Sequence, residues 1–293
     1  MKVQAECAAC LLHRGYMEAV KATDDEALRW SAMTTLINLL NREFKPDAVP
    51  AILGTKRDRV IMDVTGNPDP YAKTKQMSNQ KAMEILDLAK ALVEREPSRE
   101  SRFRRACLCS IVGNIIEFDI PKHKFEFDDV NRLLEEAEKQ LDIDQIPEIF
   151  DLAKKAKQTL YLTDNAGEIA FDTLLIQELK ALGTQVTVAV KGNPIINDAT
   201  MQDAEYVKIR EMADDVVTIG TGTVGLIPEE CSEHFLDLYS SADLIVAKGM
   251  GYAETITDLE LTRPHALLFR TKCNPVAKFF GTTRDKNITK LLP

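Results

Sequence analysis

The sequence contains no apolar run that reaches the ~18 residues a membrane-spanning helix needs. Its first residues, MKVQAE, also lack the apolar core of a secretory signal peptide. We therefore expect a cytoplasmic protein that has no membrane partner.

Acidic residues outnumber basic residues in this chain. The chain of 293 residues has 37 lysines and arginines against 46 aspartates and glutamates, which gives a formal net charge of −9. We find no basic stripe that would follow a phosphate backbone. A nucleic-acid partner is therefore not expected.

Thiols and imidazoles are few and scattered. Cys7 and Cys10 form the sequence CAAC, but a closed zinc site needs four ligands and there is no second C-x-x-C. Cys107 and Cys109 would complete such a site only if folding brought them close. We interpret Cys7 and Cys10 as buried apolar thiols or as a redox-sensitive pair. The four histidines are too dispersed to indicate a site: His13, His123, His234 and His265.

The first half of the chain has the periodicity of helices. Apolar residues recur at helical spacing in 5–21, 26–44, 78–95 and 128–141, with Asp24 and Asp25 at the expected start of the second helix and Ser78 at that of the third. A further apolar segment, 106–121, is interrupted by polar residues. We expect residues 1–155 to form an α-helical N-terminal domain.

The second half alternates short apolar runs with helical segments. The runs lie at 158–163, 185–190, 215–219, 243–247 and 265–271. This alternation is typical of a parallel sheet with helices on both faces. The predicted fold class is therefore α/β, with residues 156–293 forming a three-layer α/β/α Rossmann-like domain.

Polar side chains follow several of these strands. Asp164, Asn165 and Glu168 follow the first strand, and Asp198 follows the second. Ligands of such sheets bind beyond the carboxyl ends of the strands, and oxygen ligands without nearby histidine or cysteine favour Mg²⁺ or Mn²⁺ over structural zinc. Any one of these residues alone is explained equally well as a helix cap, but their convergence at one edge favours a divalent-cation site.

The usual phosphate-binding motifs are absent. No G-x-G-x-x-G follows the first strand, and there is no G-x-x-x-x-G-K-[ST]. A haloacid dehalogenase would have a second aspartate two residues after Asp164, where this chain has Ala166. The sheet thus carries acidic ligands without a familiar phosphate loop.

Several segments in order along nearly the whole chain resemble one family. They are CAAC, NPDPYAKTKQMSN, GNIIEFD, TDNAGEIAFDTLLIQEL, KGNPIINDAT, ADLIVAKGMGYAET and RTKCNPVA. These are similar to the DUF89 family of metal-dependent damage-control phosphatases, and most similar to its compact prokaryotic branch. The resemblance implies a helical region packed on a Rossmann-like domain, and hydrolysis of phosphomonoesters of small metabolites such as sugar phosphates.

The resemblance also implies roles for individual residues. The family's metal ligands fall on Asp164, Asn165 and Asp198, with one divalent cation (Mg, Mn, Co or Ni) as cofactor. The lysine of its K-G motif falls on Lys248, where a positive charge can hold a phosphate oxygen. We expect Asp164, Glu168 and Lys248 to be catalytic, with Glu168 acting as a base or holding the metal's water shell.

The predicted substrate contacts lie where the chain departs from the family pattern. The G-N-x-x-D motif reads Gly113 to Glu117, with glutamate in place of aspartate, and the R-T-x-K motif has its lysine one place early, at Lys272. Substrate or phosphate binding is predicted for Asn114, Glu117, Lys248, Arg270 and Lys272. The sequence does not decide whether the attacking nucleophile is water or an aspartate.

Two other functions remain as alternatives. An S-adenosylmethionine-dependent carboxyl methyltransferase also uses a Rossmann-like sheet, but it usually has a glycine-rich loop after the first strand, and here only Gly167 precedes the helix. A non-catalytic protein that binds a metal or a sugar phosphate would use the same polar residues.

Overall fold

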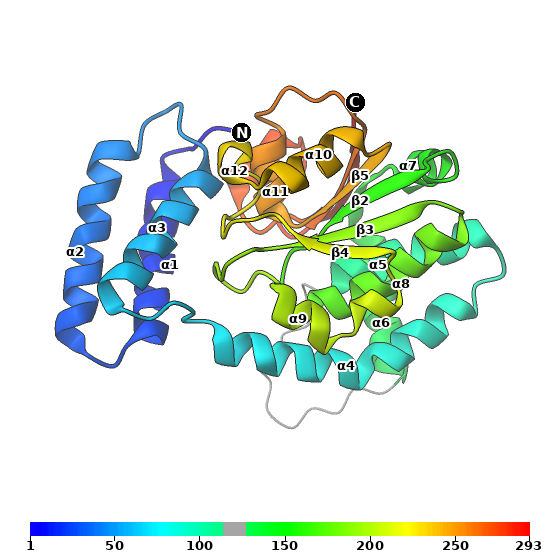
Figure 1. The fold of residues 1–293 in the computed structure, drawn as a ribbon, viewed down its shortest axis with the longest axis horizontal. Coiled ribbons are helices and arrows are strands. Elements are labelled where there is room, and N and C mark those ends of the chain that lie inside the picture. The colour runs from blue at the N-terminus through cyan, green and yellow to red at the C-terminus, as the bar shows by residue number, and fades with distance from the viewer. Residues whose placement is uncertain (114–126) are drawn as a thin grey trace.

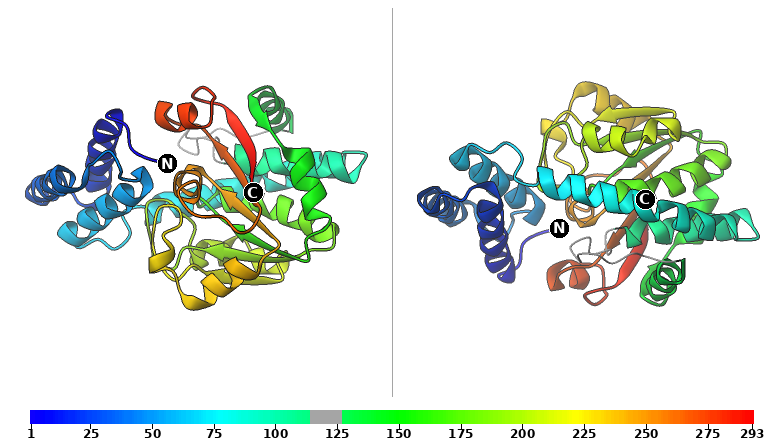
Figure 2. Two further views of the ribbon diagram at one scale, coloured as in Figure 1. Left: turned by 90° about the horizontal axis from the view of Figure 1, so that it is seen from above. Right: turned by 90° about the horizontal axis from the view of Figure 1, so that it is seen from below.

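The sheet and the N-terminal helices stand side by side in the computed structural model, which describes residues 1–113 and 127–293 (Figure 1). Within these residues a seven-stranded sheet carries helices on both faces, and α1 to α3 lie beyond one edge of the layers. Figure 2 shows the same separation from two further directions. The predicted α/β class with a three-layer sheet is confirmed.

The first three helices share a small core of their own. They are α1 (Glu6–Ala22), α2 (Glu26–Glu43) and α3 (Pro50–Thr65). Asp25 begins α2, because its carboxylate accepts hydrogen bonds from the backbone N–H groups of Ala27 and Leu28. The leucines at positions 11, 36, 39, 40 and 53 are buried against one another. This core fixes α1 and α3 as a unit next to the sheet.

The fourth helix begins earlier than predicted. It is α4 (Ala72–Glu94), so Ser78 lies inside the helix and does not cap it. The chain turns into α4 at Asp69, whose carboxylate accepts a hydrogen bond from Tyr71 N (3.1 Å). This local turn, which side-chain periodicity does not reveal, starts the helix before the predicted serine.

The strand order is β1-β7-β6-β5-β2-β3-β4, and all neighbours are parallel except β6 and β7. The five predicted strands are confirmed. β1 and β7 were not predicted, and β1 shows that the chain before residue 156 is not wholly helical. The boundary predicted between residues 155 and 156 stays a prediction. The strands are β1 (Leu141–Asp144), β2 (Gln158–Leu162), β3 (Gln185–Val190), β4 (Asp215–Thr218), β5 (Leu244–Lys248), β6 (His265–Arg270) and β7 (Asn287–Leu292).

The two faces of the sheet are covered by different helices. Side chains such as Tyr161 and Val188 pack on the side of α4 to α9, whereas Leu160 and Leu162 pack on the side of α10 to α12. The strands therefore bury both faces, as their continuous apolar sequences predict. The covering helices are α5 (Arg99–Val112), α6 (Phe127–Lys139), α7 (Ile146–Ala153), α8 (Glu168–Ala181), α9 (Met201–Tyr206), α10 (Glu233–Ser241), α11 (Met250–Ile256) and α12 (Asn274–Phe279).

The order of the strands identifies where a ligand would bind. From β2 the chain continues through β3 to β4 on one side, and then returns to β5 on the other side of β2. Loops that leave β2 and its neighbours in opposite directions open a crevice at the carboxyl ends of the strands. Among the described residues, no helix is long and apolar enough to cross a membrane.

Candidate functional site

A cavity of about 390 Å³ lies at the carboxyl ends of the central strands. Asp164, Asn165, Asp198 and Lys272 line it from the sheet, and α1 and α3 contribute the opposite wall, including Arg14 and Arg57. The N-terminal helices therefore close a site in which Asp164 and Asp198 come from the loops of the sheet and Glu6 comes from α1.

The loops after β2 and β3 are joined to each other by backbone contacts. Ala199 N donates to Asp164 O (2.8 Å), and Ala166 N donates to Asn197 O (2.9 Å). Asn165 and Asp198 form an isolated antiparallel bridge. Residues that are distant in sequence are thereby held together, and the three predicted metal ligands line one cavity.

The side-chain amide of Asn165 has a fixed orientation. Its Nδ2 donates to Asp164 Oδ2 (2.7 Å) and to Glu168 Oε2 (3.0 Å). Because the amide nitrogen faces two carboxylates, Oδ1 points away from them and is the atom available to a cation.

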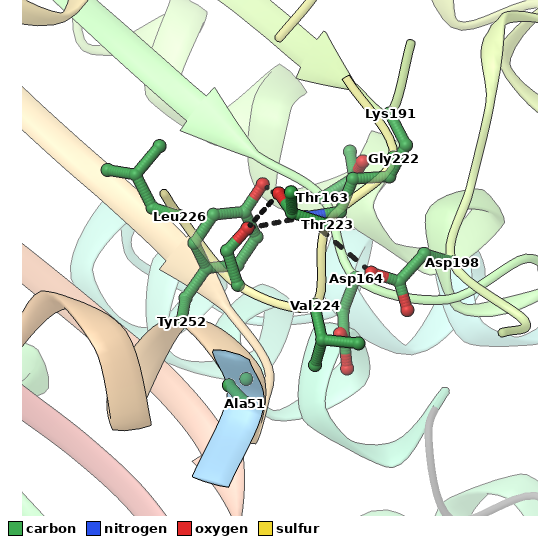
Figure 3. Close-up of polar contacts among 12 residues, drawn as sticks. Ala51, Thr163, Asp164, Lys191, Asp198, Gly222, Thr223, Val224, Leu226 and Tyr252 are labelled. Carbon is green, nitrogen blue, oxygen red and sulfur yellow. Dashed lines mark hydrogen bonds and ion pairs between the residues drawn. The ribbon is translucent and has the colours of Figure 1, made fainter. Parts of the chain in front are cut away.

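Asp198 carries a carboxylate oxygen without a hydrogen-bond partner. The side chain is 2% exposed; Oδ2 lies 3.6 Å from Lys191 Nζ, and Oδ1 has no partner within the described residues. Figure 3 shows Asp164 near Asp198, and the Lys191 amine donates to the Tyr252 hydroxyl (3.1 Å). An unpaired buried oxygen is costly unless a ligand satisfies it.

The acidic residues raise one another's proton affinity. Burial, and next the nearby Glu168 and Asp198, raise the pKa of Asp164 well above its usual range. Burial also raises the pKa of Asp198 to about 7, although Lys191 opposes the shift. Carboxylates crowded in this way favour either protons or a cation.

These residues fit a hard divalent cation. Two carboxylates and one amide supply oxygen ligands, the type that Mg²⁺ and Mn²⁺ prefer. In residues 1–113 and 127–293 no cluster of three His, Cys, Asp or Glu side chains is arranged for a metal. Because such a cation takes six or more ligands, the positions that these three residues leave open would belong to water or substrate.

Gly249 makes room for Asp164. It follows β5 with φ +86°, and a Cβ on this residue would lie 2.1 Å from Asp164 Cγ. The glycine of the K-G sequence is thus needed both for its backbone conformation and for the close approach of a carboxylate.

Lys248 lies behind the cavity wall. It is fully buried, and its Nζ donates to Ser110 O (2.8 Å), Glu168 Oε1 (2.5 Å) and Asp172 Oδ1 (3.1 Å). Burial lowers the pKa of Lys248, but Asp172 and Glu168 outweigh it, so that the pKa is raised overall. This geometry does not show the predicted direct contact of Lys248 with phosphate and suits a supporting role.

The other predicted contacts divide into three groups. Lys272 is exposed and lines the cavity. Arg270 is outside the cavity lining and donates to Gln140 Oε1 (2.7 Å) and Asn287 Oδ1 (3.0 Å), which ties β6 to its surroundings. Asn114 and Glu117 lie outside the described residues.

Sequence reasoning did not identify two arginines of the N-terminal helices that line the cavity, Arg14 and Arg57. Arg57 is 3% exposed, and its guanidinium binds the buried Asp58 through Nε (2.7 Å) and Nη2 (2.6 Å). Arg14 is exposed on α1. Since both arginines lie within ordinary helical sequence, only the packing of α1 and α3 against the sheet reveals them.

The chain is similar over its length to known proteins. A sequence profile of the damage-control phosphatase ARMT1-like domain matches residues 3–288. A damage-control phosphatase of Archaeoglobus fulgidus is 37% identical over 100% of both chains. A damage-control phosphatase of Pyrococcus horikoshii is 33% identical over 95% of this chain and 94% of its own. The crystal structure of a DUF89 family protein of Pyrococcus horikoshii superposes with a TM-score of 0.87 at 32% identity, over 99% of this chain and 98% of the other.

Proposed function

Because this chain belongs to the damage-control phosphatase ARMT1-like family, we propose that it is a divalent-metal-dependent phosphatase. Relatives that carry this name support a phosphatase function in metabolite repair. The proposed substrates are phosphomonoesters of small metabolites such as sugar phosphates. The proposed metal ligands are Asp164, Asn165 and Asp198.

One observation carries the proposal. Asp164, Asn165 and Asp198 converge on a single cavity, and the buried Asp198 Oδ1 has no partner in the described part of the chain. A helix cap requires one such residue with its oxygen turned to backbone N–H groups, whereas here the Asn165 nitrogen turns to carboxylates. A cation that binds these oxygens accounts for the whole set.

The cation and the chain have separate tasks. A divalent cation would polarise the phosphoryl oxygens and activate a bound water. Lys272 lines the same cavity from the segment after β6 and can bind the negative charge of the phosphate. The walls from α1 and α3 shield the site from water, which strengthens these charge interactions.

Glu168 and Lys248 position the ligands. Glu168 accepts from Asn165 Nδ2, and Lys248 holds Glu168 from behind. Preorganised groups of this kind lower the barrier because they need not reorganise during the reaction. The attacking group is either water or the Asp164 carboxylate, and a phosphoenzyme would form only in the second case.

The methyltransferase alternative requires backbone N–H groups free to bind a cofactor after β2. Gly167, the single glycine there, donates its N–H to Asn79 Oδ1 (2.7 Å). Asn79 in turn donates to Asp203 Oδ1 (2.7 Å). This loop is tied to α4 and α9, so no observation favours that alternative.

A direct assay tests the proposal. The purified protein is treated with a chelator, and phosphate release from p-nitrophenyl phosphate and a panel of sugar phosphates is measured before and after Mg²⁺, Mn²⁺, Co²⁺ or Ni²⁺ is restored. We expect activity only with metal, and its loss in Asp164→Ala. The proposal would be rejected if phosphate were released equally with and without metal, or if none of the esters released phosphate.

A further inference from the structure

Three cysteines that the proposed phosphatase site does not use lie on the wall of its cavity. Cys7 and Cys10 are in α1, and Cys273 directly precedes α12. All three line the same cavity as Asp164 and Asp198. The sequence alone pairs Cys7 with Cys10, and the fold adds a third thiol from the far end of the chain.

Contacts between the two segments support this proximity. Asn274 Nδ2, next to Cys273, donates to Glu6 Oε2, next to Cys7 (3.5 Å). Burial raises the pKa of Cys273 to about 11, and the nearby Cys7 and Cys10 add to the shift. The three thiols are therefore neighbours across the junction of α1 and α12.

The thiols differ in exposure. Cys10 is exposed, Cys7 is buried, and Cys273 is partly buried. Cys7 Sγ accepts a hydrogen bond from Gln4 N (3.4 Å), which holds it at the start of α1. An oxidant that enters the cavity therefore meets Cys10 first.

Helix geometry permits a bond between Cys7 and Cys10. Residues three apart on a helix have Cα atoms about 5 Å apart. Disulfides span Cα separations of roughly 4.4–6.8 Å. Both cysteines lie in the first turns of α1, at its N-terminal end, where the helix can adjust to bring the two side chains together.

We propose that Cys7, Cys10 and Cys273 form an oxidisable thiol site on the cavity wall, in which a peroxide oxidises Cys10 and Cys7 then closes a disulfide. In the first step the peroxide O–O bond breaks, an S–O bond forms at Cys10, and water leaves. In the second step the Cys7 sulfur attacks Cys10 Sγ, the S–O bond breaks, and a second water leaves with the Cys7 proton. The two sulfurs together lose two electrons, which the peroxide accepts.

The disulfide would alter the cavity. Cys7 and Cys10 share their helix with Arg14, and Cys273 is adjacent to Lys272, both of which line the site. A bond between Cys7 and Cys10 would draw the two side chains together and shift this part of the wall. The predicted effect on phosphate release rests on the proposed function, but the predicted formation of the disulfide does not depend on it.

Peptide mapping tests the thiol site. The protein is treated with hydrogen peroxide, its remaining thiols are alkylated, and it is digested with trypsin without reduction. Cys7 and Cys10 fall in residues 3–14, and Cys273 falls in residues 273–278. We expect peptide 3–14 to lose two hydrogen atoms and to regain them with dithiothreitol. Cys10→Ser should abolish the change, and Cys231→Ser should leave it intact.

Internal controls sharpen the test. Cys107 and Cys109 are fully buried in α5 and lie outside the cavity lining. We expect both to remain reduced. Two alkylated thiols in peptide 3–14 after peroxide would overturn the proposal. A bond from Cys10 to Cys273 would overturn the assignment of Cys7 as the second thiol.

Activity provides a separate measurement. Oxidation should lower the rate of phosphate release by about tenfold or more, since small displacements at a site are costly, and dithiothreitol should restore it. Cys10→Ser should be insensitive to peroxide. A disulfide with unchanged activity would overturn the effect on the cavity. A disulfide in a protein that never releases phosphate would reject the proposed function and leave the thiol site standing.

Discussion

Lys248 is the last residue of β5 and Glu168 the first residue of α8, and they meet in a buried ion pair, with Lys248 Nζ 2.5 Å from Glu168 Oε1. The same amine lies 3.1 Å from Asp172 Oδ1. Since Glu168 also accepts from Asn165, the pair connects the interior of the sheet to a proposed metal ligand. Lys248 thus acts on the site through Glu168.

Replacing Lys248 should therefore damage folding as well as activity. Lys248→Met leaves Glu168 and Asp172 buried without their cation, and we expect a loss of about 3–5 kcal/mol in the free energy of unfolding. Urea denaturation measures the change, and adding Asp172→Asn should recover part of it. A variant of unchanged stability with only a raised KM would instead indicate a direct phosphate contact.

Gly249→Ala should impair the site with a smaller effect on stability. The added Cβ would collide with Asp164 in a left-handed backbone conformation, which costs on the order of 1–3 kcal/mol. Displacement of Asp164 should lower kcat by about a hundredfold. Gly281→Ala, which has φ +73° and open space around it, controls for the backbone strain. Equal kcat values for Gly249→Ala and Gly281→Ala would show that the close approach of Gly249 to Asp164 does not matter for activity.

Part of this architecture is predictable from sequence because it is local. The five strands between Gln158 and Arg270 are short apolar runs that sequence alone indicates, and Asp164 and Asp198 lie in the loops after two of them. β1 and β7 have less of this signal: Leu141–Asp144 alternates with acidic residues, and β1 lies at the edge of the sheet, where it pairs with β7, which pairs with β6 on its other side. Edge pairing is a property of the fold.

The same distinction applies to the site. That Asp164, Asn165 and Asp198 lie together could be predicted because strand ends converge at one edge of the sheet; their role as metal ligands stays a prediction. Arg57 could not, since its place in the cavity depends on how α3 packs against the sheet. Lys248 was predicted at the end of its strand, but the partners of its buried amine are Asp172, one turn after Glu168 in α8, and Ser110 in α5, which local sequence does not reveal.

Lys272 should contribute to substrate binding. Lys272→Met removes a cavity-lining cation, and loss of one charge-assisted contact should cost about 1.5–3 kcal/mol, or roughly tenfold to a hundredfold in kcat/KM. Lys278→Met, an exposed lysine of α12 outside the cavity lining, should leave kinetics unchanged. If Lys272→Met and Lys278→Met had the same kcat/KM with sugar phosphates, Lys272 would not contribute to substrate binding.

Glu18 should make stability depend on pH. Burial, and next the neighbouring Asp58, raise the pKa of Glu18 from 4.5 to about 10. Between these values the folded chain holds a proton that the unfolded chain releases, so stability falls as pH rises through this window. Glu18→Gln removes the titration, and its stability advantage should grow by about 1.4 kcal/mol per pH unit. Urea denaturation at pH 6 and pH 8 measures it.

The matched control for this experiment is Glu260→Gln, because Glu260 is exposed. This variant should follow the wild-type protein at both pH values. If the free energies of unfolding of Glu18→Gln and wild type differed by the same amount at pH 6 and pH 8, Glu18 would already be ionised in the folded chain.

The central claim is that Asp164, Asn165 and Asp198 hold the divalent cation on which phosphate release depends. Its most direct test is a titration of the chelator-treated protein with Mn²⁺ by calorimetry, for wild type, Asp198→Asn and the exposed control Asp237→Asn. We predict one metal per chain in wild type and in Asp237→Asn, and affinity weaker by about a hundredfold or more in Asp198→Asn, where a charged ligand is lost. Equal Mn²⁺ affinity in all three proteins would contradict the account.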